Sequence, residues 1–220
     1  MPDAVRCFVG LPLPQACGPG LDALALRLAD RLCARVSWTR PGNWHVTLRF
    51  LGEVAAERVP GICAALGAID FAPVTLRLGC GGFFPPGEAC GTGGGRGAPR
   101  TLWAGLTQGG EACSRLAGLV DQALAPCGFG AQARSYRPHV TLGRVKQACQ
   151  AGGGTGDDWE AAAREVEQGL AGALFAPARV GEMLLWRSVL GPQGPKYAAL
   201  RSFPARDHGG SPERGEGWSA

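Results

Sequence analysis

The tetrapeptide His-Val-Thr-Leu occurs twice in this chain of 220 residues, at His45-Val46-Thr47-Leu48 and at His139-Val140-Thr141-Leu142. Each copy lies in a short stretch of alternating residues, which predicts a β-strand with one buried face. Within each copy the histidine and the threonine are two residues apart, so their side chains leave the same face of the strand. The valine and the leucine point the other way. The repeat predicts two equivalent strands in a duplicated fold.

The segments around the two motifs repeat one order of elements: strand, helix, strand, helix, strand. Alternation and turn residues predict strands over 5–11, 44–51, 74–78, 101–106, 135–145, 180–189 and 197–203, the last two forming a hairpin. Apolar residues at helical spacing predict helices from about residue 21 to residue 36, over 59–66 and over 113–124. We therefore expect an α+β fold.

One domain over residues 1–204 accounts for the pattern, because a chain with 45% hydrophobic residues can bury a full core. Residues 79–99 hold much of the surplus of glycine and predict a long loop. The composition changes again over 148–176, where we expect a surface insertion that carries an acidic helix. The charged, glycine-rich end, 205–220, is expected to be disordered.

The overall composition excludes few functions. Lysine and arginine outnumber aspartate and glutamate by 22 to 18, an excess that tolerates a phosphate-bearing partner without requiring one. The nine cysteines form no Cys-x-x-Cys pair with the spacing of a zinc site, and several lie in apolar stretches where a free thiol packs as a small hydrophobe. The beginning of the chain lacks the pattern of a signal peptide, and no stretch is apolar enough to span a membrane. We expect a monomer in a reducing cytoplasm.

Two of the three histidines open the two motifs, and the third, His208, lies near the end of the chain. Two facing imidazoles suit the cleavage of a cyclic phosphodiester, since one can take a proton from water while the other gives a proton to the leaving oxygen. The paired hydroxyls of Thr47 and Thr141 can hold the phosphate oxygens between them. This chemistry needs no metal and no cofactor.

Two other readings remain open at this point. A non-catalytic RNA-binding module would use the basic excess and would not need either histidine for turnover. A metal-dependent phosphoesterase would use the histidines as ligands, but no acidic residue stands beside either motif: Glu53 lies eight residues past His45, and Asp121 falls in a predicted helix.

The residues around the motifs resemble those of the two-histidine phosphoesterases, in particular the branch of RNA 2′,3′-cyclic phosphodiesterases first named 2′-5′ RNA ligases. The resemblance rests on four stretches in the same order and spacing: Arg6-Cys7-Phe8-Val9-Gly10-Leu11-Pro12, Asn43-Trp44-His45-Val46-Thr47-Leu48-Arg49-Phe50-Leu51-Gly52-Glu53, Arg137-Pro138-His139-Val140-Thr141-Leu142-Gly143-Arg144-Val145 and Arg187-Ser188-Val189-Leu190-Gly191-Pro192. They span the chain from about residue 5 to about residue 204.

The resemblance implies a bilobed fold in which each half supplies an antiparallel sheet, flanked by helices, with the active-site groove between the lobes. It further implies that His45 is the proton donor to the 3′ oxygen and His139 the proton acceptor from water. The substrate would be an RNA end that bears a 2′,3′-cyclic phosphate, and the product a 2′-phosphate. The alternatives within this class are a 2′-5′ RNA ligase and a phosphodiesterase on another cyclic substrate.

Several further residues are candidates for the site. Arg144 matches a basic position of the family, although simple alternation would put it on the face opposite His139 unless the strand bulges. Arg49 and Arg137 share a face with the histidines in the same alternation and are alternative phosphate neighbours. The candidates for stacking on a base are Phe8, Trp44, and Phe83 or Phe84, and Trp44 can equally fill the core behind its motif.

Overall fold

The computed structural model describes residues 4–84, 100–132, 135–147, 159–171, 175–191 and 194–207. The strands are β1 (Ala4–Pro12), β2 (Arg35–Trp38), β3 (His45–Ala55), β4 (Val74–Phe84), β5 (Thr101–Gln108), β6 (His139–Gln147), β7 (Ala178–Val180), β8 (Glu182–Gly191) and β9 (Gly194–Pro204). The helices are α1 (Gly18–Arg31), α2 (Val59–Gly67), α3 (Gly110–Leu124) and α4 (Trp159–Ala171), with short 3-10 turns at Gln15–Cys17, Ala56–Arg58 and Ala125–Cys127. No helix within these ranges is long and apolar enough to cross a membrane.

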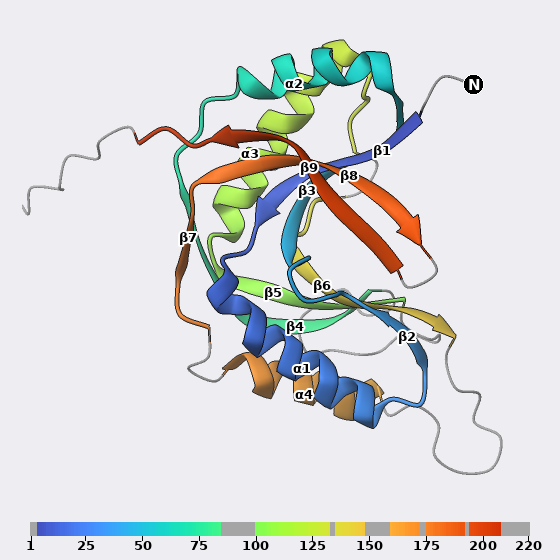
Figure 1. Ribbon diagram of the computed structural model, residues 1–220. Helices are drawn as coiled ribbons and strands as arrows, with labels where there is room; N and C mark the ends of the chain where they lie inside the picture. The colour runs from blue at the N-terminus through green and yellow to red at the C-terminus, as the bar shows by residue number, and fades with distance from the viewer. Residues whose placement is uncertain are drawn as a thin grey trace, which may run out of the picture.

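The strands form two antiparallel halves that meet at the motif strands (Figure 1). Their order is β7-β4-β5-β6-β3-β1-β8-β9, and β2 pairs with β6 beside this path. The two halves connect where β3 and β6 pair antiparallel through Val46 and Val140, the second residue of each motif. The predicted α+β fold with two antiparallel sheets is therefore confirmed, and the two motif strands form its centre.

Each half of the chain contributes a late strand to the sheet of the other half. Strand β4 closes the first half of the chain but pairs with β5, the first strand of the second half. In the same way β8 comes late in the second half and pairs with β1. Strand β9 then returns along β8 as the predicted hairpin, with Trp186 opposite Ala199.

The helices are exchanged as well (Figure 1). Helices α1 and α4 pack together on the sheet of β4, β5 and β6, whereas α3 packs on β3 and beside α2. Helix α1 follows β1 in sequence but covers the sheet of the other half. The two lobes thus depend on each other to bury their apolar faces, because each sheet takes a covering helix from the other half of the chain.

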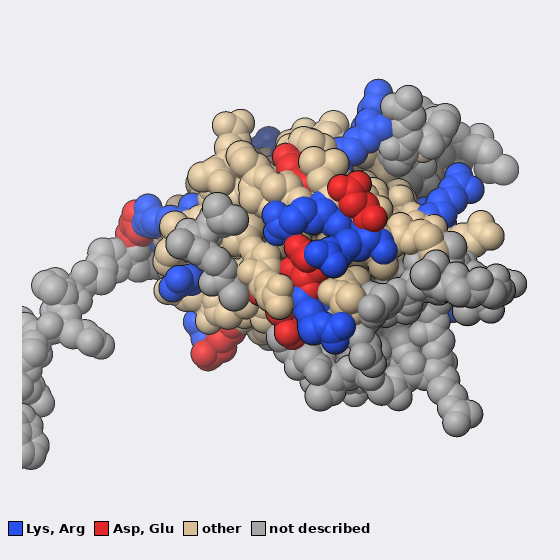
Figure 2. Space-filling view, turned by 90° about the horizontal axis from the view of Figure 1, so that it is seen from below, with Lys and Arg blue, Asp and Glu red and all other residues tan. Residues whose placement is uncertain are grey.

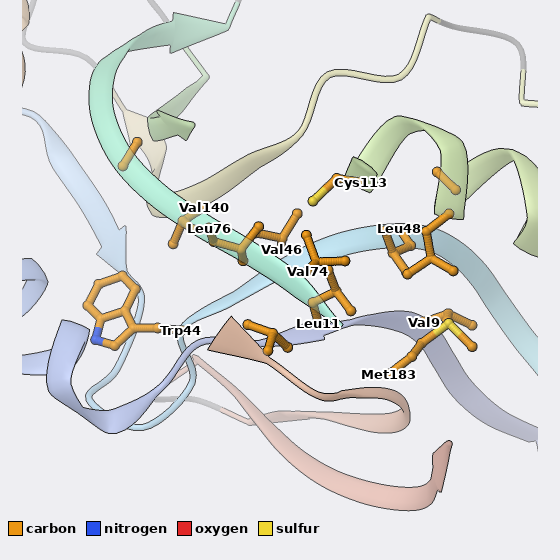
Figure 3. Close-up of a cluster of buried hydrophobic side chains, with 14 of the residues drawn as sticks. Val9, Leu11, Trp44, Val46, Leu48, Val74, Leu76, Cys113, Val140 and Met183 are labelled. Atoms are coloured by element: carbon orange, nitrogen blue, oxygen red, sulfur yellow. The ribbon is translucent and has the colours of Figure 1, made fainter. Parts of the chain in front are cut away.

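One large hydrophobic core joins the two halves. Val46 and Val140 are fully buried in it, as are Leu48 and Leu142 at 1% exposed or less. Figure 3 shows Val46, Val140 and Leu76 in one cluster of apolar side chains. Since the apolar residues of each motif face this core, the histidine and the threonine are left on the opposite face of their strand.

Four sequence predictions need correction. Helix α1 ends at Arg31, and Val36 belongs to β2, where Ser37 and Trp38 continue the pairing with β6. Within 148–176, α4 is a core helix and no surface insertion: Val166 and Leu170 are buried, and Val166 packs so closely on Gly81 of β4 that a side chain at that glycine would collide with it.

The other two corrections concern the end of the chain and one cysteine. The predicted tail begins later than expected, because residue 205 still donates to the carbonyl of Gly181; residues 208–220 lie outside the described residues. Cys7, Cys17 and Cys113 are free, buried thiols as expected, whereas Cys33 is disulfide-bonded.

Candidate active site

The pairing of β3 with β6 brings the polar residues of both motifs together. In an antiparallel pair with Val46 opposite Val140, the register carries His45 toward Thr141 and His139 toward Thr47. All four side chains lie on the face opposite the core, since each is one residue away from a buried valine. The predicted motif residues therefore converge at the centre of the molecule.

Both histidines are held by the same local hydrogen bond. His45 Nδ1 lies 2.7 Å from the carbonyl oxygen of Asn43, and His139 Nδ1 lies 2.7 Å from that of Arg137. A carbonyl oxygen can only accept, so Nδ1 carries the hydrogen in each ring. The titrating atom of both imidazoles is therefore Nε2, which accepts a proton when the ring is neutral and donates one when it is charged.

Burial makes both imidazoles reluctant to take a charge. It lowers the pKa of His45 from 6.5 to about 4, against the carbonyl of Asn43, which raises it, and with smaller lowering contributions from His139 and Arg144. Burial likewise lowers the pKa of His139, again against its carbonyl partner and together with Arg144. The positive charge of Arg144 therefore contributes to the lowered pKa of both imidazoles.

Each histidine stands beside a stacked pair of a phenylalanine and a tryptophan. Phe8 and Trp186 stack at 5.0 Å and 21°, and the ring of His45 lies 4.9 Å from Phe8 and 5.5 Å from Trp186. On the other side Phe84 and Trp103 stack at 5.0 Å and 19°, with His139 5.0 Å from Phe84. These rings account for the desolvation of both imidazoles.

A β-bulge lies at the leucine of each motif. Strand β1 pairs Gly10 with Thr47 and Val9 with Arg49, which leaves Leu48 as the extra residue of β3. Strand β5 pairs Trp103 with Thr141 and Leu102 with Gly143, which leaves Leu142 as the extra residue of β6. A bulge shifts the alternation by one residue, so the residue two positions after each leucine joins the face of the histidine.

The bulge at Leu142 puts Arg144 on the same face as His139. Simple alternation would have placed Arg144 on the other face, and no pattern in the sequence indicates that the strand bulges at Leu142. The guanidinium lies 3.5 Å from the hydroxyl of Thr101, and the side chain is exposed. It lines one pocket together with His45, Thr47 and Thr141.

The bulge at Leu48 has the opposite effect on Arg49. Its side chain is 8% exposed, forms an ion pair with Asp121 of α3 and donates to the carbonyl of Gly130. The prediction that Arg49 shares a face with His45 is therefore wrong, and Arg49 is a structural residue between β3 and α3.

The remaining candidates fall into different places. Phe8 and Trp44 are 2% and 5% exposed, so neither presents a free ring face to a base, and Trp44 donates its indole hydrogen to Asp22 at 3.0 Å. Phe83 packs against the core and Phe84 lies beside His139. The side chain of Arg137 is exposed, and its carbonyl holds His139.

The pocket residues that sequence reasoning missed include two aromatic rings near the motifs. Phe50, which the bulge at Leu48 turns outward, is 59% exposed and lines the pocket. Tyr197, at the start of β9, also lines it, and its ring stands 5.3 Å from His45 at a right angle. His139 is not part of the wall of this pocket. Neither bulge nor hairpin register is legible in the sequence, so no pattern pointed to these two rings.

Charge is mixed on the face of the protein that carries α1 and α4. Figure 2 shows basic and acidic side chains interspersed on the face seen from below. Some of them are paired across α1 and α4, where Glu165 binds Arg27 at 2.8 Å and Arg31 at 3.1 Å. Within the described ranges, no three His, Cys, Asp or Glu side chains gather in an arrangement that could hold a metal ion.

Comparisons with known proteins show which family this chain resembles. The family described as LigT like phosphoesterase matches residues 11–89 and 106–197. A protein of Archaeoglobus fulgidus named RNA 2′,3′-cyclic phosphodiesterase is 31% identical over 169 residues, which are 76% of this chain and 83% of that protein. One of the same name from Aeropyrum pernix is 28% identical, over 76% of this chain and 85% of that protein.

Solved structures share the fold. The crystal structure of E. coli LigT complexed with 3′-AMP superposes with a TM-score of 0.68 at 21% identity, covering 93% of this chain and all of that chain. The crystal structure of TT0787 from Thermus thermophilus gives the same TM-score at 24% identity, covering 92% of this chain and 99% of that chain. At these identities the likeness concerns the fold.

Proposed function

The chain belongs to the LigT-like phosphoesterase family and is a phosphodiesterase, and from that premise we propose that it hydrolyses the 2′,3′-cyclic phosphate end of RNA to a 2′-phosphomonoester without a metal ion. The observation that carries the proposal is the pairing of the two motif strands, which directs two histidines and two threonines to one face. Relatives that are similar over three quarters of this chain bear the name of the same activity.

In the proposed reaction the two imidazoles divide the proton transfers. His139 Nε2 takes a proton from water as the water oxygen attacks phosphorus. The bond from phosphorus to the 3′ oxygen breaks, and His45 Nε2 gives its proton to that oxygen. The 2′ ester bond remains, so the product is a 2′-phosphomonoester and the histidines have exchanged protonation states.

The threonines and Arg144 would hold the phosphate during this exchange. Thr47 and Thr141 lie across from the opposite histidine in the strand register, so their hydroxyls can donate to the two non-bridging oxygens. Arg144 lines the same pocket and brings a fixed positive charge to oxygens that become more negative in the transition state.

The pKa of His45 bears on its role as the acid. A pKa of about 4 leaves the ring neutral at pH 7, which is the wrong protonation state for a proton donor. A bound phosphodiester carries a negative charge, and an opposite charge within a few ångström raises the pKa of an imidazole. A His45 that becomes protonated in the complex can then donate its proton to the leaving oxygen.

The direct test uses an oligoribonucleotide with a 2′,3′-cyclic phosphate end, incubated with the purified protein in a strong chelator. We expect hydrolysis, with phosphorus NMR placing the product phosphate on the 2′ oxygen. A 3′-phosphate product, or no turnover, would overturn the proposal. Adding an RNA with a 5′-hydroxyl end to the same assay distinguishes the ligase alternative, which requires a joined product.

A further inference from the structure

We propose that the end of β6, together with β2, forms a second phosphate site, which binds the backbone of the RNA strand upstream of the cyclic phosphate. The site consists of Lys146 and Arg35 and continues from Arg144 on the same face of the sheet. The inference rests on the proposed function and deepens it, because it makes the preferred substrate an oligonucleotide end and not a free nucleotide. It comes from the strand register, from exposure and from a comparison of the two halves.

The register of β2 and β6 brings the two basic side chains to one place. Strand β2 lies beside the end of β6 (Figure 1), where Ser37 pairs with Arg144 and Arg35 pairs with Gln147. Lys146 comes two residues after Arg144, so its side chain leaves the same face of β6. Arg35 likewise lies two residues from Ser37 and shares its face. The two cations therefore extend the row that begins with Arg144 in the catalytic pocket.

Both basic groups are open to solvent and available to an anion. Lys146 and Arg35 are exposed, whereas Val145 between the two arms of the row is half-buried. Among the described residues, neither of the two cations forms an ion pair with a carboxylate; the ion pairs there involve other arginines. A cation without a carboxylate partner can neutralise a phosphate and release the counterion that the phosphate carries.

The two halves of the fold differ at this point although their strands correspond. The residues two, four and five positions after the motif leucine are Arg144, Lys146 and Gln147 in the second half and Phe50, Gly52 and Glu53 in the first. Glu53 is exposed and pairs in register with Arg6 of β1, so the end of β3 carries one charge of each sign. The end of β6 carries positive charges, to which β2 adds Arg35. An RNA strand that leaves the catalytic pocket is therefore attracted more strongly along β6 than along β3.

The spacing of the cations suits a nucleic-acid backbone. Two residues of a β-strand span about 7 Å, so Lys146 stands about that far beyond Arg144, a step close to that between neighbouring phosphates of an extended strand. Arg35 lies on the adjacent strand, about 4.8 Å away, and reaches the same region. Proteins that bind single strands follow the backbone with such basic side chains, and phosphate contacts carry no base sequence. The site would thus lengthen the bound RNA without selecting its bases.

The test compares two substrates that differ in their upstream phosphates: adenosine 2′,3′-cyclic phosphate has none, and the trinucleotide ApApA with a 2′,3′-cyclic phosphate end has two. We expect the wild-type kcat/KM to be on the order of 10-fold higher on the trinucleotide, because each exposed ion pair contributes about 3- to 5-fold. Arg35→Gln/Lys146→Gln should lose this advantage and keep the wild-type rate on the mononucleotide. Lys146→Arg keeps the charge and should stay within about twofold of the wild type on both substrates.

The matched control is Arg77→Gln/Arg201→Gln, which removes two exposed positive charges elsewhere. Arg77 pairs with Gln108, at the end of the β4 and β5 ladder that is remote from the pocket. Arg201 pairs with Leu185, whose buried side chain faces the core, so the arginine lies on the other face of the sheet. The control should keep the full trinucleotide advantage.

Four results would overturn the inference. The first is a wild type that shows no preference for the trinucleotide, and the second is a preference that survives in Arg35→Gln/Lys146→Gln. The third is an equal loss on both substrates in that variant, which would mean that the two residues only support the catalytic pocket. The fourth is the same loss in the control, which would mean that net charge alone attracts the RNA.

A binding measurement separates this inference from the proposed function. If the wild type turns over neither substrate, the proposed function fails. Fluorescence anisotropy still tests the phosphate site, with ApApA that bears a 2′-phosphate end and a fluorescein at its 5′ end. The logarithm of the affinity should fall with the logarithm of the salt concentration, and the slope for Arg35→Gln/Lys146→Gln should be shallower than that of the wild type by about 1.4, or about 0.7 per lost phosphate contact. An unchanged slope would overturn the inference independently of catalysis.

Discussion

The half of the site around His45 and the half around His139 share a backbone and differ in their surroundings. Each has a histidine held through Nδ1 by a carbonyl two residues earlier, a threonine two residues later and a bulge at the following leucine. The first half adds Tyr197 beside its histidine and Phe50 beyond the bulge, whereas the second half adds Arg144. In the proposed mechanism the duplication supplies two proton carriers, and the differences between the halves let these carriers take different roles.

The largest expected effect comes from removing either histidine. We expect His45→Ala and His139→Ala each to reduce kcat by roughly 10²–10⁴-fold on a 2′,3′-cyclic phosphate, because each removes one proton transfer. The double variant should be little worse than the singles, since the two residues act as a unit. Circular dichroism serves as the control for folding. Unchanged turnover in either single variant would show that this histidine takes no part in the proton transfers.

The next effect is a dependence of stability on pH, caused by the lowered pKa of His45. Its lowered pKa, about 4, means that the unfolded chain takes up a proton near pH 6.5 that the folded chain takes up only near pH 4. The free energy of unfolding should therefore fall by about 3 kcal/mol for this group as the pH drops from 7 to 4.

Denaturant unfolding at both pH values measures this fall. His45→Gln lacks the titrating group. Between pH 7 and pH 4 its free energy of unfolding should therefore fall by about 3 kcal/mol less than that of the wild type. We expect the difference to be smaller for His139→Gln. If wild type and His45→Gln lose stability in parallel, His45 is not a buried neutral imidazole.

The next prediction concerns Arg144, the basic residue that follows the bulge in the second half and has no counterpart in the first. Arg144→Ala should reduce kcat/KM by roughly 10- to 100-fold, because the charge that stabilises the phosphoryl oxygens is lost. Arg144→Lys should recover part of the loss, since a lysine carries the charge without the planar guanidinium. Steady-state kinetics over a range of salt concentrations measures both. A loss confined to low salt would show that Arg144 only attracts the substrate from a distance.

We expect the smallest effect on catalysis from Arg49. It follows the bulge at Leu48 directly, as Gly143 follows the bulge at Leu142. Arg49→Met should lower the free energy of unfolding by about 1–2 kcal/mol, because Asp121 loses its ion pair and the carbonyl of Gly130 its hydrogen bond from Arg49. The kcat of the folded fraction should not change. A large loss of kcat at full folding would instead return Arg49 to the site.

The sequence predicted the elements better than their connections. The motif strands, the helix from Val59 and the final hairpin were legible because periodicity and turn residues are local. The exchange of β4 and β8 between halves was not, since it depends on pairing across the whole chain. Helix α4 was mistaken for a surface segment because its acidic composition masked the buried residues Val166 and Leu170.

The same distinction between local patterns and long-range pairing applies to the candidate site. The two histidines and two threonines could be found because a repeated motif on a strand fixes their shared face. The facing of Arg49, Phe50 and Arg144 depends on bulges that are set by pairing with β1 and β5, so simple alternation misplaced them. Tyr197 enters the site from β9, far from either motif in sequence, and no local pattern connects them.

The measurement that tests the division of tasks most directly uses a cyclic phosphate whose 3′ oxygen is replaced by sulfur. A thiol has a pKa of about 8.5, far below that of an alcohol. The sulfur can therefore leave as a thiolate, without receiving a proton from an acid. We predict that His45→Ala cleaves this substrate at a rate close to that of the wild type, while His139→Ala remains slow. Recovery in neither variant, or in His139→Ala alone, would contradict the assignment of His45 as the acid and His139 as the base.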